Sequence, residues 1–170
     1  MAACGVKLGW TGGTNRHSVA ELMISFAIAA LRHVGPLYHE MRSGGRPHHR
    51  MGRHLRGRCV GLHGCGNVGK EVVKLLKPFD CRVLACDIRD YGEFYRAHGV
   101  EAVSMNELLE RSEVLSLHLP LNSTTAGLYS AETLDRLRPD CVLINTCRGG
   151  IVDDTALKIR LYDGRIRAAC

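Results

Sequence analysis

Three glycines have the spacing of a phosphate-binding turn. Gly64, Gly66 and Gly69 follow an apolar run and open an amphipathic one. Such a turn needs a tight bend at the first glycine, an open backbone at the second and close strand-to-helix packing at the third. A helix that begins near Asn67 and Val68 would direct its unpaired amides and positive dipole end at the phosphates. The motif therefore predicts a pyrophosphate site.

An acidic residue stands where ribose recognition requires one. Asp87 follows the apolar run 82–86, and a dinucleotide site places an acid about 20 residues beyond the glycines. A carboxylate there accepts hydrogen bonds from the adenosine ribose hydroxyls and repels the additional phosphate of NADP. NAD is therefore the expected cofactor, and Arg89 leaves NADP open as the alternative.

Two other segments lie at the carboxyl ends of expected strands, at the edge where parallel sheets bind ligands. The residues in question are His118, Leu119 and Pro120 in the first segment, and Thr146, Cys147 and Arg148 in the second. Pro120 ends its strand and turns the chain over the cofactor. Together with the glycine motif and Asp87, these residues form the predicted cofactor site.

Arg148 is the candidate for substrate binding. An arginine at the carboxyl end of a strand, in a cleft that holds a dinucleotide, can bind a carboxylate through two hydrogen bonds. Hydride transfer to a 2-oxo acid needs this contact, because the reacting carbon must be held against the nicotinamide ring. The alternative is a structural arginine that pairs with Asp153 or Asp154.

Short apolar runs alternate with helical patterns along the chain. After a short apolar run at 6–8, the expected strands are 59–62, 82–86, 100–103, 114–119, 141–145 and 166–170. Strands that alternate with helices require a parallel sheet with right-handed crossovers. The fold class is therefore α/β, a doubly wound parallel sheet of the Rossmann type, truncated after the start of its sixth strand.

Polar caps indicate where the helices begin. Capping boxes are expected at Ser18 with Glu21 and at Ser104 with Glu107. Ser130 is expected to cap a later helix that ends before Pro139, and Asp153 or Asp154 caps the last helix, which stops at Gly164. The first helix is expected to kink or stop near Gly35 and Pro36, a second runs over 67–77, and 91–98 is expected to be a loop or a short helix.

Composition predicts one cytoplasmic domain. A chain of 170 residues can bury one good core. Its eight cysteines form no Cys-x-x-Cys pair, so we expect buried thiols in a reducing compartment and no metal site. The longest apolar segment, 22–31, is too short to span a bilayer. We therefore expect no membrane partner and no signal peptide.

A basic window accounts for much of the net charge of +6. It contains Arg42, Arg46, Arg50, Arg53, Arg56 and Arg58, with His48, His49 and His54 among them. Nucleic acid is one possible partner, but the window has no aromatic residue for base stacking and several glycines. A solvated connecting loop is the preferred interpretation, so no nucleic-acid partner is expected. The histidines lack a carboxylate or thiol to complete a metal site.

Three blocks of the sequence resemble the D-isomer-specific 2-hydroxyacid dehydrogenases, such as phosphoglycerate dehydrogenase. These blocks are 64–69, 117–121 and 144–153, of which Ile-Asn-Thr-Cys-Arg-Gly-Gly-Ile-Val-Asp is the most specific. The segment 11–21 is similar to the entry into the family's cofactor domain, where a long helix takes part in dimer contact. The resemblance implies a homodimer formed through the helix 18–31.

The resemblance also implies roles for individual residues. Asn67 and Val68 would lie against the pyrophosphate, and Asp87 on the ribose. Leu119 and residues 146–148 would line the nicotinamide half, and Arg148 would bind the carboxylate and carbonyl of a small 2-hydroxy or 2-oxo acid. The sequence departs from the family at His63, where an aliphatic residue is usual, and at Arg160, where a small one is common.

The implied function is NAD-dependent hydride transfer between nicotinamide and a D-2-hydroxy acid or 2-oxo acid. The alternative is a non-catalytic, NAD-sensing module of the corepressor type. Residues 1–170 would form the NAD-binding domain, with 1–17 as an interdomain entry segment and most of the substrate domain absent. The family's acid/base histidine and its orienting glutamate would also lie outside this chain, so we expect little activity from it alone.

Overall fold

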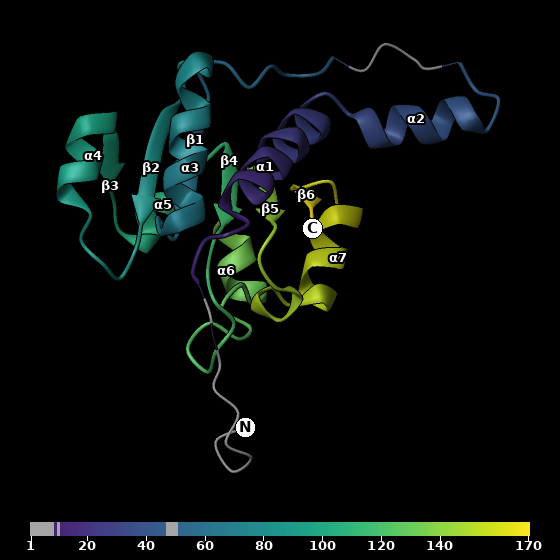
Figure 1. Ribbon diagram of the computed structural model, residues 1–170. Helices are drawn as coiled ribbons and strands as arrows, with labels where there is room; N and C mark the ends of the chain where they lie inside the picture. The colour runs from purple at the N-terminus through teal and green to yellow at the C-terminus, as the bar shows by residue number, and fades with distance from the viewer. Residues whose placement is uncertain (1–8, 10, 47–50) are drawn as a thin grey trace.

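The computed structural model describes residues 9, 11–46 and 51–170. The apolar run at 6–8 and the residues His48, His49 and Arg50 lie outside the described residues. Six strands form one sheet in the order β3-β2-β1-β4-β5-β6, and all neighbours are parallel (Figure 1). This is the doubly wound α/β sheet expected from the alternation of strands and helices, because the order reverses between β1 and β4.

The strands lie close to their predicted positions. They are β1 (Cys59–His63), β2 (Arg82–Cys86), β3 (Val100–Ala102), β4 (Val114–Leu117), β5 (Val142–Asn145) and β6 (Arg167–Ala169). The strand predicted over 114–119 stops at Leu117, so His118 and Leu119 belong to the loop beyond it. All four residues of β4 and of β5 are buried, as in a sheet covered on both faces.

Helices cover both faces of the sheet (Figure 1). They are α1 (Arg16–Leu31), α2 (Val34–Arg42), α3 (Asn67–Leu76), α4 (Gly92–His98), α5 (Met105–Arg111), α6 (Ala131–Asp135) and α7 (Asp154–Tyr162). One core cluster packs α1 and α3 on one face, and another packs α5, α6 and α7 on the other. The last residues of the strands are thereby held at one edge of the sheet.

The helix caps are mostly as predicted, with one error. Ser104 and Glu107 form a capping box, Ser130 accepts a hydrogen bond from the Thr133 amide, and Asp153 caps α7. The capping box predicted at Ser18 is wrong. The helix begins two residues earlier, at Arg16, and the Ser18 hydroxyl donates to the Asn15 carbonyl at 3.0 Å.

The break after α1 also lies earlier than Gly35 and Pro36. The chain turns at Arg32 and His33, and His33 has a left-handed φ of 56°. Pro36 falls within the first turn of α2. Backbone amides in the first turn of a helix have no partner within the helix, so proline loses no hydrogen bond there and the helix continues. α2 then runs away from the sheet (Figure 1) and buries none of its residues.

Beyond Arg42, the described residues of the basic window form a loop, as predicted, and several of its arginines make specific contacts. Arg58 Nη1 lies 2.7 Å from Glu113 Oε1, and Arg56 pairs with Asp80. Arg53 Nη2 donates to the carbonyl of Asp140 at 2.7 Å. These three arginines lie in the predicted loop, and the sequence did not predict their contacts with acids and a carbonyl distant in the chain.

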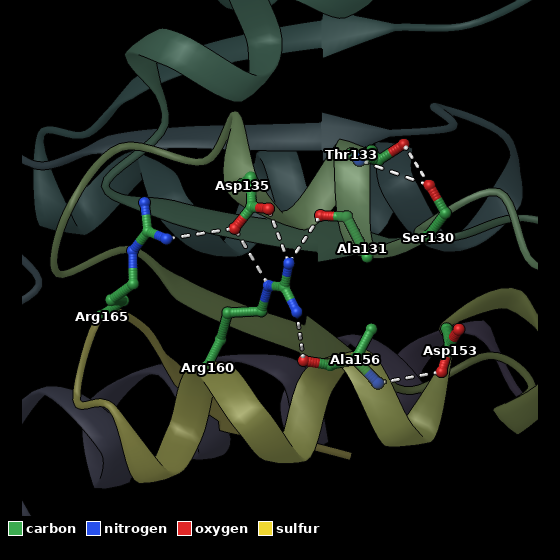
Figure 2. Close-up of polar contacts among 8 residues, drawn as sticks. All are labelled: Ser130, Ala131, Thr133, Asp135, Asp153, Ala156, Arg160 and Arg165. Atoms are coloured by element: carbon green, nitrogen blue, oxygen red, sulfur yellow. Dashed lines mark hydrogen bonds and ion pairs between the residues drawn. The ribbon is translucent and has the colours of Figure 1, made fainter.

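The Arg160 side chain links α6 and α7, which both pack in the second core cluster. Figure 2 shows its guanidinium between α6 and α7, where Nη2 lies 2.6 Å from Asp135 Oδ2. The same group donates to the carbonyls of Ala131 and Ala156, both at 3.1 Å. A long side chain fits here because each of its three guanidinium nitrogens donates to an acceptor.

No single described helix is long and apolar enough to cross a membrane. α1 and α2 together pass that test of length and composition, but they are bent by 64°. Within α1, the side chains of Ala20, Met23, Ala27 and Leu31 are fully buried in the first core cluster.

Candidate dinucleotide site

A cavity of about 700 Å³ lies at the carboxyl edge of β1, β2 and β4. It brings together most of the predicted cofactor residues, which are Gly64, Gly66, Asn67, Val68, Gly69, Asp87, His118, Leu119 and Pro120. The loop before α1 also lines this cavity, through Gly12, Gly13 and Asn15. Segments far apart in sequence therefore meet in one cavity at the point where the strand order reverses.

Each glycine of the turn has the geometry its position requires. Gly64 has a φ of 94°, and a Cβ on it would lie 2.6 Å from the His118 carbonyl oxygen. A Cβ on Gly69 would lie 2.6 Å from the Gly64 carbonyl oxygen. A Cβ on Gly66, by contrast, would meet no atom within 4 Å, because that backbone faces the open cavity.

The amino end of α3 is available to an anion. Gly66 is its N-cap, and no side chain caps the first amides. Unpaired amides and a positive dipole end form a site for phosphate. The first amides of α3 and the open backbone at Gly66 together fit the pyrophosphate of a dinucleotide.

Asp87 does more than the sequence predicts. Its Oδ2 accepts a hydrogen bond from the Cys65 amide at 2.6 Å, and its Oδ1 accepts one from the Arg89 amide at 2.8 Å. The carboxylate lines the cavity and also fixes the glycine turn to the end of β2. Its spacing from the glycines indicates the first role, and no sequence signal indicates the second.

His118 lines the cavity, and one of its ring nitrogens is buried. Its Nε2 has no hydrogen-bond partner among the described residues. Burial lowers the pKa of His118 to about 4, so the imidazole is neutral at neutral pH. A buried nitrogen without a partner beside the open turn also fits a polar ligand in this cavity.

The structure places Thr146, Cys147 and Arg148 apart from these residues. They line a second cavity of about 340 Å³ beyond β5, against Leu22 and Phe26 of α1. The two cavities lie at the same edge of the sheet, but the larger one does not include this segment. The predicted residues thus form two neighbouring groups.

Arg148 has no acidic partner within the described part of the chain. Its side chain is exposed, and Nη1 donates to the carbonyl of Cys147 at 2.7 Å. Asp153, one of the two partners named in the structural alternative, instead accepts a hydrogen bond from the Ala156 amide at 2.9 Å. The guanidinium therefore remains available to an external carboxylate.

Asn145 supports this arginine and was not predicted as a site residue. Its side chain is buried, Nδ2 donates to the Arg148 carbonyl at 2.9 Å, and Oδ1 accepts from the Cys147 amide at 3.1 Å. Asn122 shapes the loop over the larger cavity by accepting hydrogen bonds from Thr124 and Thr125. The run of small polar residues at 122–125 signals such a loop, whereas nothing in the sequence distinguishes Asn145 as a brace.

Comparisons with known proteins also indicate a dinucleotide-binding domain. Residues 24–170 match the D-isomer specific 2-hydroxyacid dehydrogenase, NAD binding domain. Hydroxypyruvate reductase of Thermotoga maritima is 31% identical over 97% of the chain, and D-3-phosphoglycerate dehydrogenase of Methanocaldococcus jannaschii is 33% identical over 89%. A glyoxylate reductase from Paecilomyes thermophila superposes with a TM-score of 0.87 at 26% identity, over 98% of the chain and 52% of that structure.

The chain spans 53% of the length of that hydroxypyruvate reductase and 29% of that phosphoglycerate dehydrogenase. The matched part contains the glycine turn, Asp87 and the Arg148 segment. The chain belongs to the D-isomer-specific 2-hydroxyacid dehydrogenases and is an NAD-binding domain of that family.

Proposed function

We propose that the complete protein transfers a hydride between NAD and a small 2-hydroxy or 2-oxo acid. The observation that carries this proposal is Arg148, a guanidinium at the end of β5 with no acidic partner among the described residues. Relatives named as hydroxypyruvate and glyoxylate reductases support a 2-oxo acid as the substrate class. They also disfavour the alternative of a non-catalytic sensing module.

The chain's own residues would bind and orient the reactants. The amides at the start of α3 would hold the pyrophosphate, Asp87 would accept from the ribose hydroxyls, and Arg148 would bind the substrate carboxylate. Leu119 and Pro120 would cover the cofactor at the end of β4. When bound, NAD would supply or accept the hydride at its nicotinamide ring.

Cofactor preference gives the first test. We expect NADH to bind this chain at least about 10-fold more tightly than NADPH, because the Asp87 carboxylate repels a 2′-phosphate. Asp87→Ala should weaken NADH binding and bring the two affinities closer. Fluorescence titration of the wild type and the variant with both cofactors measures this. Equal binding of NADH and NADPH by the wild type would contradict the assignment of Asp87.

We also propose that α1 and α2 contact a second copy of the chain. α2 buries no residue, and Val34, Tyr38 and Met41 on it are 51%, 62% and 63% exposed. On α1, Leu22 and Ile28 are 44% and 38% exposed. A second copy of the same apolar helices would remove this surface from water.

The cytoplasmic location stays a prediction from the cysteine pattern.

A charged substitution on α2 tests the dimer. Tyr38→Asp should raise the dimer dissociation constant by at least about 10-fold, because it would place an unpaired charge in an apolar interface. Tyr162→Asp is the matched control, since Tyr162 is 90% exposed on α7. Sedimentation velocity over a range of concentrations distinguishes the outcomes. A wild type that is monomeric at all concentrations would rule the proposal out.

A further inference from the structure

His63 joins the glycine turn to a buried tyrosine. It is the last residue of β1, and its Nδ1 lies 2.8 Å from the Tyr129 hydroxyl oxygen. The two rings meet edge to face, with centroids 5.8 Å apart. Tyr129 is itself fixed in place, because its amide donates to the Ile151 carbonyl and its carbonyl accepts from the Asp153 amide. His63 also lines the larger cavity, so the residue that contacts Tyr129 also belongs to the ligand site.

The buried hydroxyl determines which nitrogen of His63 carries the proton. Tyr129 is fully buried, and burial raises its pKa well above the usual value, so it keeps its proton. Burial lowers the pKa of His63 to about 4, and the nearby Asp87 only partly opposes this, so the imidazole is neutral and carries one N–H.

Within the described part of the chain, His63 Nδ1 is the only hydrogen-bond partner of the Tyr129 hydroxyl. If Nδ1 carried the hydrogen, the hydroxyl proton would be buried without an acceptor, which is the costly arrangement. The phenol therefore donates to Nδ1, and the hydrogen of the imidazole is on Nε2.

No described residue accepts a hydrogen bond from Nε2 of His63. Asp87 supplies the nearby negative charge, and its oxygens accept from the Cys65 and Arg89 amides but not from Nε2 of His63. Nε2 stands on the side of the ring away from Nδ1 and its buried partner. His63 directly precedes Gly64, the first residue of the phosphate-binding turn.

We propose that His63 is a cofactor-binding residue whose Nε2–H donates a hydrogen bond to a pyrophosphate oxygen of the dinucleotide, with Tyr129 as the residue that positions it. This inference rests on the proposed NAD site and adds a side-chain donor to a turn that otherwise offers backbone amides. A neutral donor suits the turn, because it binds an anionic oxygen without the cost of burying a second charge.

Nitrogen NMR of the ¹⁵N-histidine-labelled chain tests the tautomer directly. We expect the His63 ring to show protonated Nε2 and unprotonated Nδ1 at neutral pH, and we expect the Nε2 resonance to shift when ADP is added. Tyr129→Phe should increase the share of the other tautomer. A wild-type ring protonated at Nδ1, or an Nε2 resonance that ADP leaves unchanged, would overturn the proposal.

Binding measurements test the contact itself. His63→Leu should weaken NADH and ADP by about 10-fold, the effect of one hydrogen bond to a charged acceptor, and should leave adenosine binding unchanged. His63→Gln keeps an N–H donor and should recover part of the loss. His98→Leu on α4 is the matched control, because His98 bonds the Phe94 carbonyl and does not line this cavity.

The outcomes separate the two hypotheses. If the wild type binds neither NADH nor ADP, the proposed function fails. If the wild type binds both and His63→Leu binds them equally well, only the role of His63 fails. A loss that is equal for adenosine and ADP would assign the contact to the ribose and overturn the pyrophosphate contact. Thermal unfolding of each variant shows whether a loss of binding merely reports a loss of fold.

Discussion

Arg148→Gln is expected to lower kcat/KM for a 2-oxo acid by about 100-fold or more in the complete protein, with the Kd for NADH changed by less than about two-fold. Glutamine keeps a polar side chain of similar reach but loses the charge and the paired donors that bind a carboxylate. NADH affinity should persist because Arg148 does not line the larger cavity. A 100-fold change corresponds to about 2.7 kcal/mol of transition-state stabilisation.

Steady-state kinetics with a series of 2-oxo acids, alongside NADH titration, makes this measurement. Arg148→Lys is the informative control, because it keeps the charge and loses only the planar, two-pronged geometry. We expect it to recover part of the activity. If Arg148→Gln retains wild-type kcat/KM, Arg148 has a structural role and the proposed substrate contact is wrong.

Gly61→Ala is expected to lower the free energy of unfolding by about 3 kcal/mol or more. A Cβ at this central position of β1 would lie 1.9 Å from Ser112 Oγ and 3.0 Å from Leu108 Cδ1. Ser112 is fully buried, and its hydroxyl donates to the Leu108 carbonyl at 2.5 Å. The added Cβ would also lie 3.0 Å from Ser112 Cβ, which side-chain rotation cannot move, so relief requires a shift of α5 relative to β1.

The same substitution at Gly66 provides the contrast. A Cβ there meets nothing within 4 Å, so Gly66→Ala should change stability by less than about 1 kcal/mol and should instead weaken NADH binding. Urea denaturation of both variants, with NADH titration of Gly66→Ala, tests the pair. Equal stability of Gly61→Ala and the wild type would show that the sheet and α5 are less tightly packed than described.

The parts of the site that depend on local backbone requirements could be predicted from the sequence. Gly64 must adopt a positive φ, Gly66 must leave space, and Gly69 must pack closely, so each glycine marks its own role. The caps at Ser104, Ser130 and Asp153 are equally local, since each bonds an amide three residues on. The doubly wound parallel sheet followed from the alternation of strands and helices.

Contacts between distant segments could not be predicted in this way. The bond from His63 to Tyr129 spans 66 positions, and that from Arg160 to Asp135 spans 25. Propensity and spacing carry no information about such pairs. The start of α1 was misplaced for a related reason: Ser18 has the residue type of a cap, but its hydroxyl is occupied by the Asn15 carbonyl.

The central pairing of β1 with β4 also bears on how the chain folds. Val60 lies beside Val114, whereas β2 and β3 occupy the intervening sequence on the other side of β1. The chain must close that long loop before these two hydrophobic strands gain anything from meeting. Refolding should therefore be slower than for a helical bundle of the same length, with the rate set by the search that brings the two halves of the sheet together.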